Sequence, residues 1–286
     1  MRWEGNRESE NVEDRRGSSF GLGGRSVGLG TIAIALILSW VLGISPTTVL
    51  SLLTGGPTDI SAVQQPAQRP PADDQMTRFV STVLADTEDT WNALFSAQGA
   101  DYVEPRLVLF SDMTPTACGT GQSAAGPFYC PGDQKIYIDL SFYRLMQERF
   151  RVSGEFAQAY VIAHEVGHHV QHLMGISDQV DSARRRMSEA QGNAMSVRLE
   201  LQADCFAGVW AHHADRARSI LEAGDVEAAL GAASAIGDDA LQRQSQGHVV
   251  PDSFTHGTSE QRVRWFTRGI ESGDVNACNT FEARRL

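Results

Sequence analysis

The sequence predicts an α+β fold in which a small β-sheet comes first and helices follow. Residues 106–110 (RLVLF) and 135–139 (KIYID) are short, mostly aliphatic and aromatic runs that are typical of strands. From Gly154 onward, apolar residues recur mostly at helical spacing. Strands followed by a run of helices favour the α+β class over the α/β class, in which strands and helices alternate. We therefore expect a mainly helical domain with a small sheet, preceded by one long apolar helix.

The composition is that of a globular protein and narrows the range of functions. The 286 residues can form one sizeable domain with appendages. Hydrophobic residues make up 42% and charged residues 21%, which is ordinary for a folded chain. The formal net charge is −11, whereas a phosphate backbone requires a basic surface. The charge argues against nucleic acid as a partner.

The first 26 residues differ from the rest of the chain. They are polar, rich in Gly and Arg, and carry five arginines and five acidic residues. Such a segment has too few apolar residues to build a core, so we expect residues 1–26 to be a disordered tail.

A long apolar segment follows this tail. No charged residue occurs from Ser26 to Thr58, and Val27–Ile44 is apolar for long enough to span a bilayer. A cleaved signal peptide, a buried core helix and a re-entrant segment bent at Pro46 are the alternatives. We favour one transmembrane helix over residues 27–53.

The charges around this segment predict its orientation. Five arginines precede it, of which Arg15, Arg16 and Arg25 are the nearest, and neither Lys nor Arg follows before Arg69. By the positive-inside rule, we expect the N-terminus to lie in the cytoplasm and the rest of the chain to lie outside, as a single-pass protein of the cell membrane. Residues 54–72, rich in Pro, Gly and Gln, are typical of a linker. We expect the folded domain to cover residues 73–286.

Within the domain, the pattern predicts a helix over 75–97 and strands over 106–110, 127–130 and 135–139. A turn at Pro131-Gly132-Asp133 joins the last two strands. Further helices are expected over 155–173, 178–213, 215–223, 225–243 and 258–272.

The four cysteines form an even set without a C-x-x-C pair. A cysteine zinc site is therefore not expected, and two disulfides formed in an oxidising compartment are favoured. Spacing leaves all three pairings open. The cysteines are Cys118, Cys130, Cys205 and Cys278.

The main chemical signal is a pair of histidines four residues apart. His164 and His168 lie on the predicted helix 155–173, so both imidazoles project from one face, one turn apart. This spacing suits two ligands of one Zn²⁺ ion. Glu165 follows the first histidine and can reach a water molecule on the metal, from which it would take a proton as general base. A surface helix with unrelated histidines is the alternative.

A zinc peptidase needs a third protein ligand and one open position. The metzincin pattern is excluded, because it requires Gly at Gln171 and His at Met174. His172 could ligate only if the helix bent, so we place it on the surface or behind the ligands. His169 points to another face and is expected to be a bystander.

Glu200 is the better candidate for the third ligand. It lies on a second predicted helix, and two packed helices can bring a carboxylate to the open side of a histidine pair. Asp204 lies one turn later on the same face and can accept a hydrogen bond from the other nitrogen of a zinc histidine. Their neighbours are mostly apolar or small, which favours a partly buried carboxylate pair over solvated helix charges.

A later segment, from His256 to Arg262, adds two more candidates. Thr258 or Ser259 can cap the helix that follows. His256 would then lie at the rim of the site and could stabilise negative charge in the transition state. Arg262 is expected on the helix behind it, in a structural pair with a buried acid. A capped helix start without a catalytic role is the alternative.

The chain resembles the bacterial family named "putative neutral zinc metallopeptidase" nearly end to end. The resemblance rests on residues 1–3 (MRW), 11–17 (NVEDRRG), 126–131 (GPFYCP), 163–171 (AHEVGHHVQ) and 200–208 (ELQADCFAG). It implies a membrane-anchored, zincin-like peptidase domain with Zn²⁺ as cofactor.

The order of motifs also looks like that of the CAAX-prenyl peptidase type of gluzincin. By that likeness, Glu200 matches the third ligand, Asp204 the residue behind it, and His256 and Arg262 the later His…Arg element. The chain departs from that type in its single predicted span and in Gly257, where Pro is usual. Prenylated or intramembrane substrates are therefore not carried over.

These observations predict a membrane-anchored zinc endopeptidase that acts on a peptide or protein. Two other functions remain open, namely a non-catalytic zinc-binding module tethered to the membrane and a zinc hydrolase of non-peptide amides. The intact Glu165 argues against the module, because a binding site needs no general base.

Overall fold

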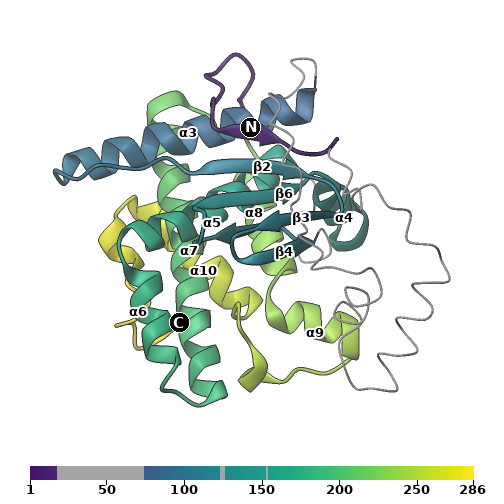
Figure 1. Ribbon diagram of the computed structural model, residues 1–286, viewed down its shortest axis with the longest axis vertical. Helices are drawn as coiled ribbons and strands as arrows, with labels where there is room; N and C mark the ends of the chain where they lie inside the picture. Colours follow the sequence, from purple (N-terminus) through teal and green to yellow (C-terminus); the bar gives the residue numbers. More distant parts are fainter. Residues whose placement is uncertain (18–73, 123–125, 153) are drawn as a thin grey trace, which may run out of the picture. The chain divides into compact units, whose positions relative to one another are not determined.

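The structure is a computed structural model that describes residues 1–17, 74–122, 126–152 and 154–286 (Figure 1). Residues 1–15 and the chain from residue 74 onward belong to one compact unit. The predicted transmembrane helix at 27–53 and linker at 54–72 lie outside the described residues. Within the described part of the chain, no helix has the length and apolar character that a membrane crossing requires.

A four-stranded sheet forms one layer of the domain. Its order is β1 (Val12–Asp14), β2 (Arg106–Phe110), β6 (Lys135–Asp139) and β5 (Phe128–Cys130). The first three strands are parallel, and β5 runs antiparallel to β6. A separate hairpin pairs β3 (Met113–Thr116) with β4 (Gly119–Gln122). The α+β class and the three predicted strands are confirmed.

Helices make up most of the domain and pack beside the sheet (Figure 1). In chain order they are α3 (Gln75–Ala97), α4 (Ser141–Phe150), α5 (Glu155–Leu173), α6 (Ile176–Arg184), α7 (Glu189–Arg218), α8 (Asp225–Ala235), α9 (Asp238–Gln246) and α10 (Ser259–Ser272). Short 3₁₀ turns cover η2 (Pro251–Ser253) and η3 (Val275–Cys278). The helices predicted at 75–97, 155–173 and 258–272 are confirmed.

Two long predicted helices are each divided in the structure. The helix expected over 178–213 ends at Arg184, and α7 starts anew at a capping box formed by Ser188 and Gln191. The helix expected over 225–243 is interrupted at Gly237, where a Cβ atom would lie 2.4 Å from the backbone nitrogen of Ser259. The helix expected over 215–223 is wrong, because α7 continues to Arg218 and is followed by irregular chain.

The prediction of a disordered tail over residues 1–26 is wrong for residues 1–17. β1 pairs with β2, with Val12 opposite Leu107, and Trp3 is 3% exposed with its ring against Phe79 at 5.5 Å. Composition gave the wrong prediction for this segment because its charged side chains pair with residues far away in the sequence. Glu13, for example, accepts a hydrogen bond from Lys135 at 2.8 Å.

Two helices that carry the predicted site residues cross at very close range. A Cβ atom at Gly167 of α5 would lie 2.9 Å from the carbonyl oxygen of Ala203 in α7. The absence of a side chain at Gly167 therefore lets the two backbones touch at this point. This crossing lies next to His168 in one helix and Asp204 in the other.

The four cysteines form two disulfides, Cys118–Cys130 and Cys205–Cys278. The prediction of two disulfides is confirmed, and the structure selects one of the three possible pairings. The second disulfide joins α7 to η3 across 73 residues of sequence, so it fixes the end of the chain to the helix that carries Glu200.

Candidate active site

Helix α5 presents the two predicted zinc histidines on its face toward α7. Most of α5 is buried, so the helix is held by packing on nearly all sides. His164 and His168 are one turn apart, and their ring centroids are 4.8 Å from each other at an angle of 88°. Two imidazoles crossing at a right angle can converge on one point without a clash.

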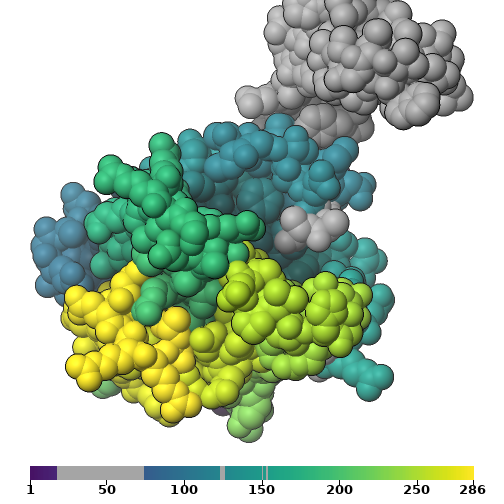
Figure 2. Space-filling view, turned by 90° about the horizontal axis from the view of Figure 1, so that it is seen from below, coloured from purple at the N-terminus to yellow at the C-terminus, as the bar shows by residue number. Residues whose placement is uncertain are grey.

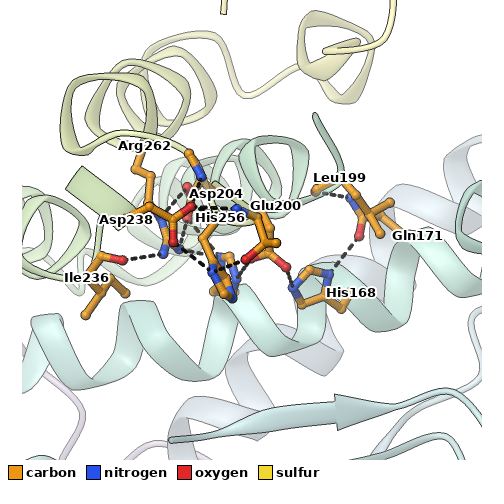
Figure 3. Close-up of polar contacts among 12 residues, drawn as sticks. His168, Gln171, Leu199, Glu200, Asp204, Ile236, Asp238, His256 and Arg262 are labelled. Carbon is orange, nitrogen blue, oxygen red and sulfur yellow. Dashed lines mark hydrogen bonds and ion pairs between the residues drawn. The ribbon is translucent and has the colours of Figure 1, made fainter. Parts of the chain in front are cut away.

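Glu200 reaches this point from α7. One carboxylate oxygen lies 3.2 Å from Nε2 of His164, and the other lies 3.4 Å from Nε2 of His168. Figure 3 shows the carboxylate between the two helices, directed at the imidazoles. One ligand atom from each of these three residues can be chosen so that all lie within 4.8 Å of one another. The predicted ligand set is thus brought together.

The remaining ring nitrogens have separate partners. Nδ1 of His164 lies 2.8 Å from Oδ1 of Asp204, and Nδ1 of His168 lies 2.9 Å from Oε1 of Gln171. Because carboxylate and amide oxygens accept hydrogen bonds, each Nδ1 carries the proton. Both Nε2 atoms therefore face Glu200, with their lone pairs free when the imidazoles are neutral.

Asp204 is the centre of a buried polar network behind His164. Its side chain is fully buried and accepts two hydrogen bonds from Arg262, each 2.9 Å long. Tyr160 donates a further hydrogen bond at 2.5 Å and is itself 3.2 Å from Arg262. The expected pairing of Arg262 with a buried acid is found here. The bidentate pair neutralises Asp204 and holds it in position for His164.

Gln171 is a residue of the site that the sequence analysis treated only as evidence against metzincins. It is fully buried, and its amide nitrogen donates to the carbonyl oxygen of Leu199 at 2.7 Å. Its oxygen accepts from His168, so Gln171 links the second histidine to the residue before Glu200. The sequence feature that could have identified Gln171 is its position three residues after His168, which places both side chains on one helix face.

Glu165 is buried within the site, with 7% of its surface exposed. Burial raises the pKa of its carboxyl group; His164 and His168 act to lower it, and Glu200 raises it further. These electrostatic effects come from all three residues of the candidate metal site. Glu165 is therefore a buried carboxylate with a raised affinity for protons, next to His164 in α5.

The electrostatics of the three residues favour a cation. Burial alone would raise the pKa of Glu200, but His168 and His164 hold it well below its usual range. Burial alone would lower the pKa of His164, but Asp204 and Glu200 raise it to about 9. The two carboxylates thus create a negative potential at the imidazoles.

His256 lies in the loop before α10 and is held by Asp238, the first residue of α9. Oδ2 of Asp238 accepts from the backbone nitrogens of residues 255, 256 and 257, and Oδ1 lies 3.2 Å from Nδ1 of His256. The hydrogen bond to Asp238 raises the pKa of His256, and Glu200 raises it further. In the described residues, no hydrogen bond joins His256 to the three candidate ligands. Figure 3 shows it on the side of the site opposite His168.

The two other histidines of α5 do not join the site. His169 is fully buried between Val103, whose carbonyl oxygen is 2.6 Å from Nε2, and the Tyr129 hydroxyl at 3.0 Å. Burial lowers its pKa to about 4, so it is neutral and fastens α5 to β5. His172 faces Tyr129 and Gln134 instead. His169 lies on another face of α5, as expected. His172, expected on the surface or behind the ligands, is half-buried beside Tyr129.

Comparison with known proteins identifies the family. The family described as "Putative neutral zinc metallopeptidase" matches residues 1–281. The chain belongs to this family. It is 53% identical to "Uncharacterized protein YpfJ" of Escherichia coli (strain K12) over 287 residues, which cover 98% of this chain and 99% of the relative.

Mycobacterial members of the family are also similar. "Uncharacterized protein Rv2575" of Mycobacterium tuberculosis is 42% identical over 220 residues, and "Uncharacterized protein Mb2605" of Mycobacterium bovis has the same identity. Each alignment covers 73% of this chain and 73% of the relative. No solved structure matches the chain significantly.

The metal that the family name implies fits the residues present. Two imidazole nitrogens and a carboxylate form a usual donor set for catalytic zinc, and such sites leave a fourth position open. Each imidazole is supported by a hydrogen-bond acceptor on its far side, as zinc histidines generally are. The side chains of His168 and Glu200 stay 16% and 18% exposed, so solvent reaches the point where a fourth ligand would bind. Figure 2 shows the surface recessed between the yellow-green segment that contains α9 and the teal segments of the strands.

Proposed function

We propose that this protein is a membrane-attached zinc peptidase whose catalytic domain lies on the extracytoplasmic side. The observation that carries the proposal is the meeting of His164, His168 and Glu200 at one point, together with the buried Glu165 that follows His164 in α5. A module that only binds zinc has no need of Glu165. The two disulfides support an oxidising compartment for the domain, and the apolar segment 27–53 would provide the attachment to the membrane.

Each group of the site would have its own role in peptide hydrolysis. Zinc, when bound, polarises the scissile carbonyl and makes water more acidic. Glu165 accepts the proton of the attacking water and returns it to the leaving amine. Its pKa, raised by burial, suits a carboxylate that must hold a proton for part of the reaction. The hydrogen bond to Asp238 raises the pKa of His256. In its protonated form, His256 would donate from Nε2 to the negative charge that develops on the substrate oxygen.

The test is zinc analysis and a peptide-library digest of the full-length chain, with Glu165→Gln as the catalytic variant. Residues 73–286 alone are unsuitable, because they lack β1. The variant should retain zinc and lose at least about 100-fold in hydrolysis, since a positioned general base contributes roughly 10²- to 10⁴-fold. Glu189→Gln, exposed at the start of α7, is the matched control and should keep full activity.

The two other functions give different results in the same experiment. If zinc binds but the wild-type chain cleaves no peptide, the endopeptidase proposal is wrong. Hydrolysis of cell-wall amides that depends on Glu165 would then assign a zinc amidase, and zinc binding without any hydrolysis would assign a binding module.

A further inference from the structure

Helix α7 makes two sets of contacts on opposite faces. On one face, Glu200 points at the histidines of α5. Arg198, Gln202 and Cys205 follow the spacing i, i+4, i+7, so they share the other face of the helix. All three contact residues 278–283. The turn of α7 that carries the candidate ligand is therefore held from the side away from the metal site.

The segment behind α7 is attached by a covalent bond and by hydrogen bonds. Cys278 forms the disulfide with Cys205, and both residues are fully buried. The carbonyl oxygen of Cys278 accepts a hydrogen bond from the amide nitrogen of Gln202 at 3.1 Å. Thr280, also fully buried, donates to the carbonyl oxygen of Arg198 at 2.6 Å, and Arg198 donates back to the carbonyl oxygen of Thr280. These bonds fix the position of the segment on the helix.

Gln202 passes this attachment on to the second histidine. Its amide oxygen accepts a hydrogen bond from the amide nitrogen of Gln171 at 3.1 Å. Gln202 is 5% exposed and Gln171 is fully buried, so water does not compete for these bonds. The oxygen of Gln171 lies 2.9 Å from Nδ1 of His168, as Figure 3 shows. A continuous chain of hydrogen bonds thus runs from the carbonyl of Cys278 through two amides to the imidazole.

The direction of this chain is determined at its outer end. A carbonyl oxygen only accepts, so Gln202 must turn its nitrogen toward Cys278 and its oxygen toward Gln171. Gln171 must then present its nitrogen to Gln202, which leaves its oxygen for His168. The carbonyl of Leu199 imposes the same orientation on Gln171. The proton of His168 therefore lies on Nδ1, and Nε2 keeps the lone pair that a metal requires.

We propose that Gln202 is a positioning residue of the zinc site, which transmits the orientation set by the carbonyl of Cys278 to His168 through Gln171. Gln202 touches neither the metal nor a substrate and acts only by ordering the second histidine. The inference deepens the proposed function and rests on its zinc site, but it does not depend on peptide cleavage. Residues 278–280 are then a support of the metal site as well as a part of the fold.

The zinc affinity of the full-length chain, measured by competition with a fluorescent chelator, tests the proposal. Gln202→Met keeps the length of the side chain and removes both hydrogen bonds. It should weaken zinc binding by about 3- to 10-fold, which is less than the loss of a direct partner of a zinc histidine. Gln147→Met, exposed on α4, is the matched control and should bind zinc as the wild type does.

A second variant covers the case in which Gln202→Met does not fold. Gln202→Asn keeps the amide but is one methylene too short to reach both partners, so it should also weaken zinc binding. Circular dichroism of the metal-free chain shows which variants are folded. A folded variant at this position with the zinc affinity of the wild type would overturn the proposal.

The route through Gln171 is tested by a double-mutant cycle. If Gln202 acts only through Gln171, the double variant with Gln171→Ala should bind zinc no more weakly than Gln171→Ala alone. A residue that only stabilises the fold would show no such dependence. Losses that multiply in the double variant would therefore refute the positioning role.

The visible absorption spectrum of the Co²⁺-loaded chain is a second readout, because its bands report the geometry of the ligands. The bands should shift in Gln202→Met and stay unchanged in Gln147→Met. Identical spectra in both would overturn the proposal. A wild-type chain that binds zinc but cleaves no peptide would refute the peptidase alone and leave these results standing, whereas a wild-type chain that binds no zinc would refute both.

Discussion

Gln171 joins the two helices of the site through a single amide. Its oxygen lies 2.9 Å from Nδ1 of His168 in its own helix, while its nitrogen donates to the carbonyl oxygen of Leu199, next to Glu200. The second histidine and the candidate carboxylate ligand are therefore held in register by one side chain. This relationship explains why a fully buried glutamine lies at this position.

Replacing Gln171 with Ala should weaken zinc binding by about 10- to 100-fold, which is usual when the hydrogen-bond partner of a zinc histidine is lost. His168 would then be free to rotate and to change its tautomer. Competition with a fluorescent zinc chelator measures the affinity. Gln179→Ala, exposed on α6, is the control and should bind zinc as the wild type does.

Glu200→Gln should reduce zinc affinity by more than about 100-fold, a larger loss than for any supporting residue. The substitution keeps the size of the side chain but removes the charge that draws a cation to the two imidazoles. Glu189→Gln on the same helix is the matched control. Equal affinities for these two variants in the chelator assay would mean that the third ligand is another residue.

Asp204→Asn should destabilise the protein by roughly 3–5 kcal/mol, because Arg262 would remain charged and buried without its partner. Chemical unfolding of the metal-free chain measures this effect. The double variant with Arg262→Met should recover part of the loss, since it removes the unpaired charge. A single variant as stable as the wild type would show that the network contributes nothing.

His256→Gln should lower kcat by about 10²- to 10³-fold while zinc content and KM stay near their wild-type values. The reason is that a donor to the developing negative charge acts mainly in the transition state. Asp238→Asn should reduce kcat in the same direction, because it releases the loop and the imidazole together. His248→Gln, exposed on the preceding loop, is the control. A change in KM alone would assign His256 to substrate binding instead.

The stability that Glu13 provides should disappear in acid. Burial alone would raise its pKa, but hydrogen bonds from Lys135, Arg15 and Arg106 lower it from 4.5 to about 2. The contribution is therefore complete above about pH 4.5 and is lost as the pH falls toward 2. Glu13→Gln should cost about 1 kcal/mol near neutral pH, since solvent screens the charges of its more exposed partners Arg15, Arg106 and Lys135.

Urea unfolding at several pH values measures this difference. The gap between wild type and Glu13→Gln should narrow steadily below about pH 4.5. Glu4→Gln, exposed in the same segment, should match the wild type throughout. A gap that does not change with pH would show that the charge of Glu13 is not what matters.

The sequence was most informative where local spacing determines geometry. The four-residue interval between His164 and His168 places both rings on one helix face whatever surrounds them. Glu200 and Asp204 followed from the same rule on a second helix. The break before α7 was also detectable, because Ser188 and Gln191 form a capping box that local sequence displays.

The N-terminal strand was missed because its stability comes from distant residues. β1 has three residues, two of them acidic, which gives no pattern typical of a strand. Lys135 and Arg106 supply the neutralising charges, and β2 supplies the hydrogen bonds. No local window contains these partners. Composition alone therefore gave the wrong result for residues 1–17.

The pairing of Val12 with Leu107 also sets the order of events during synthesis. Ninety-five residues separate the two positions, so at about 5–20 residues per second the first strand waits roughly 5–20 s for its neighbour to be translated. The apolar stretch leaves the ribosome during this interval. A nascent chain therefore exposes its apolar stretch before β1 can pair with β2, whereas in a chain refolded from denaturant both are present from the start.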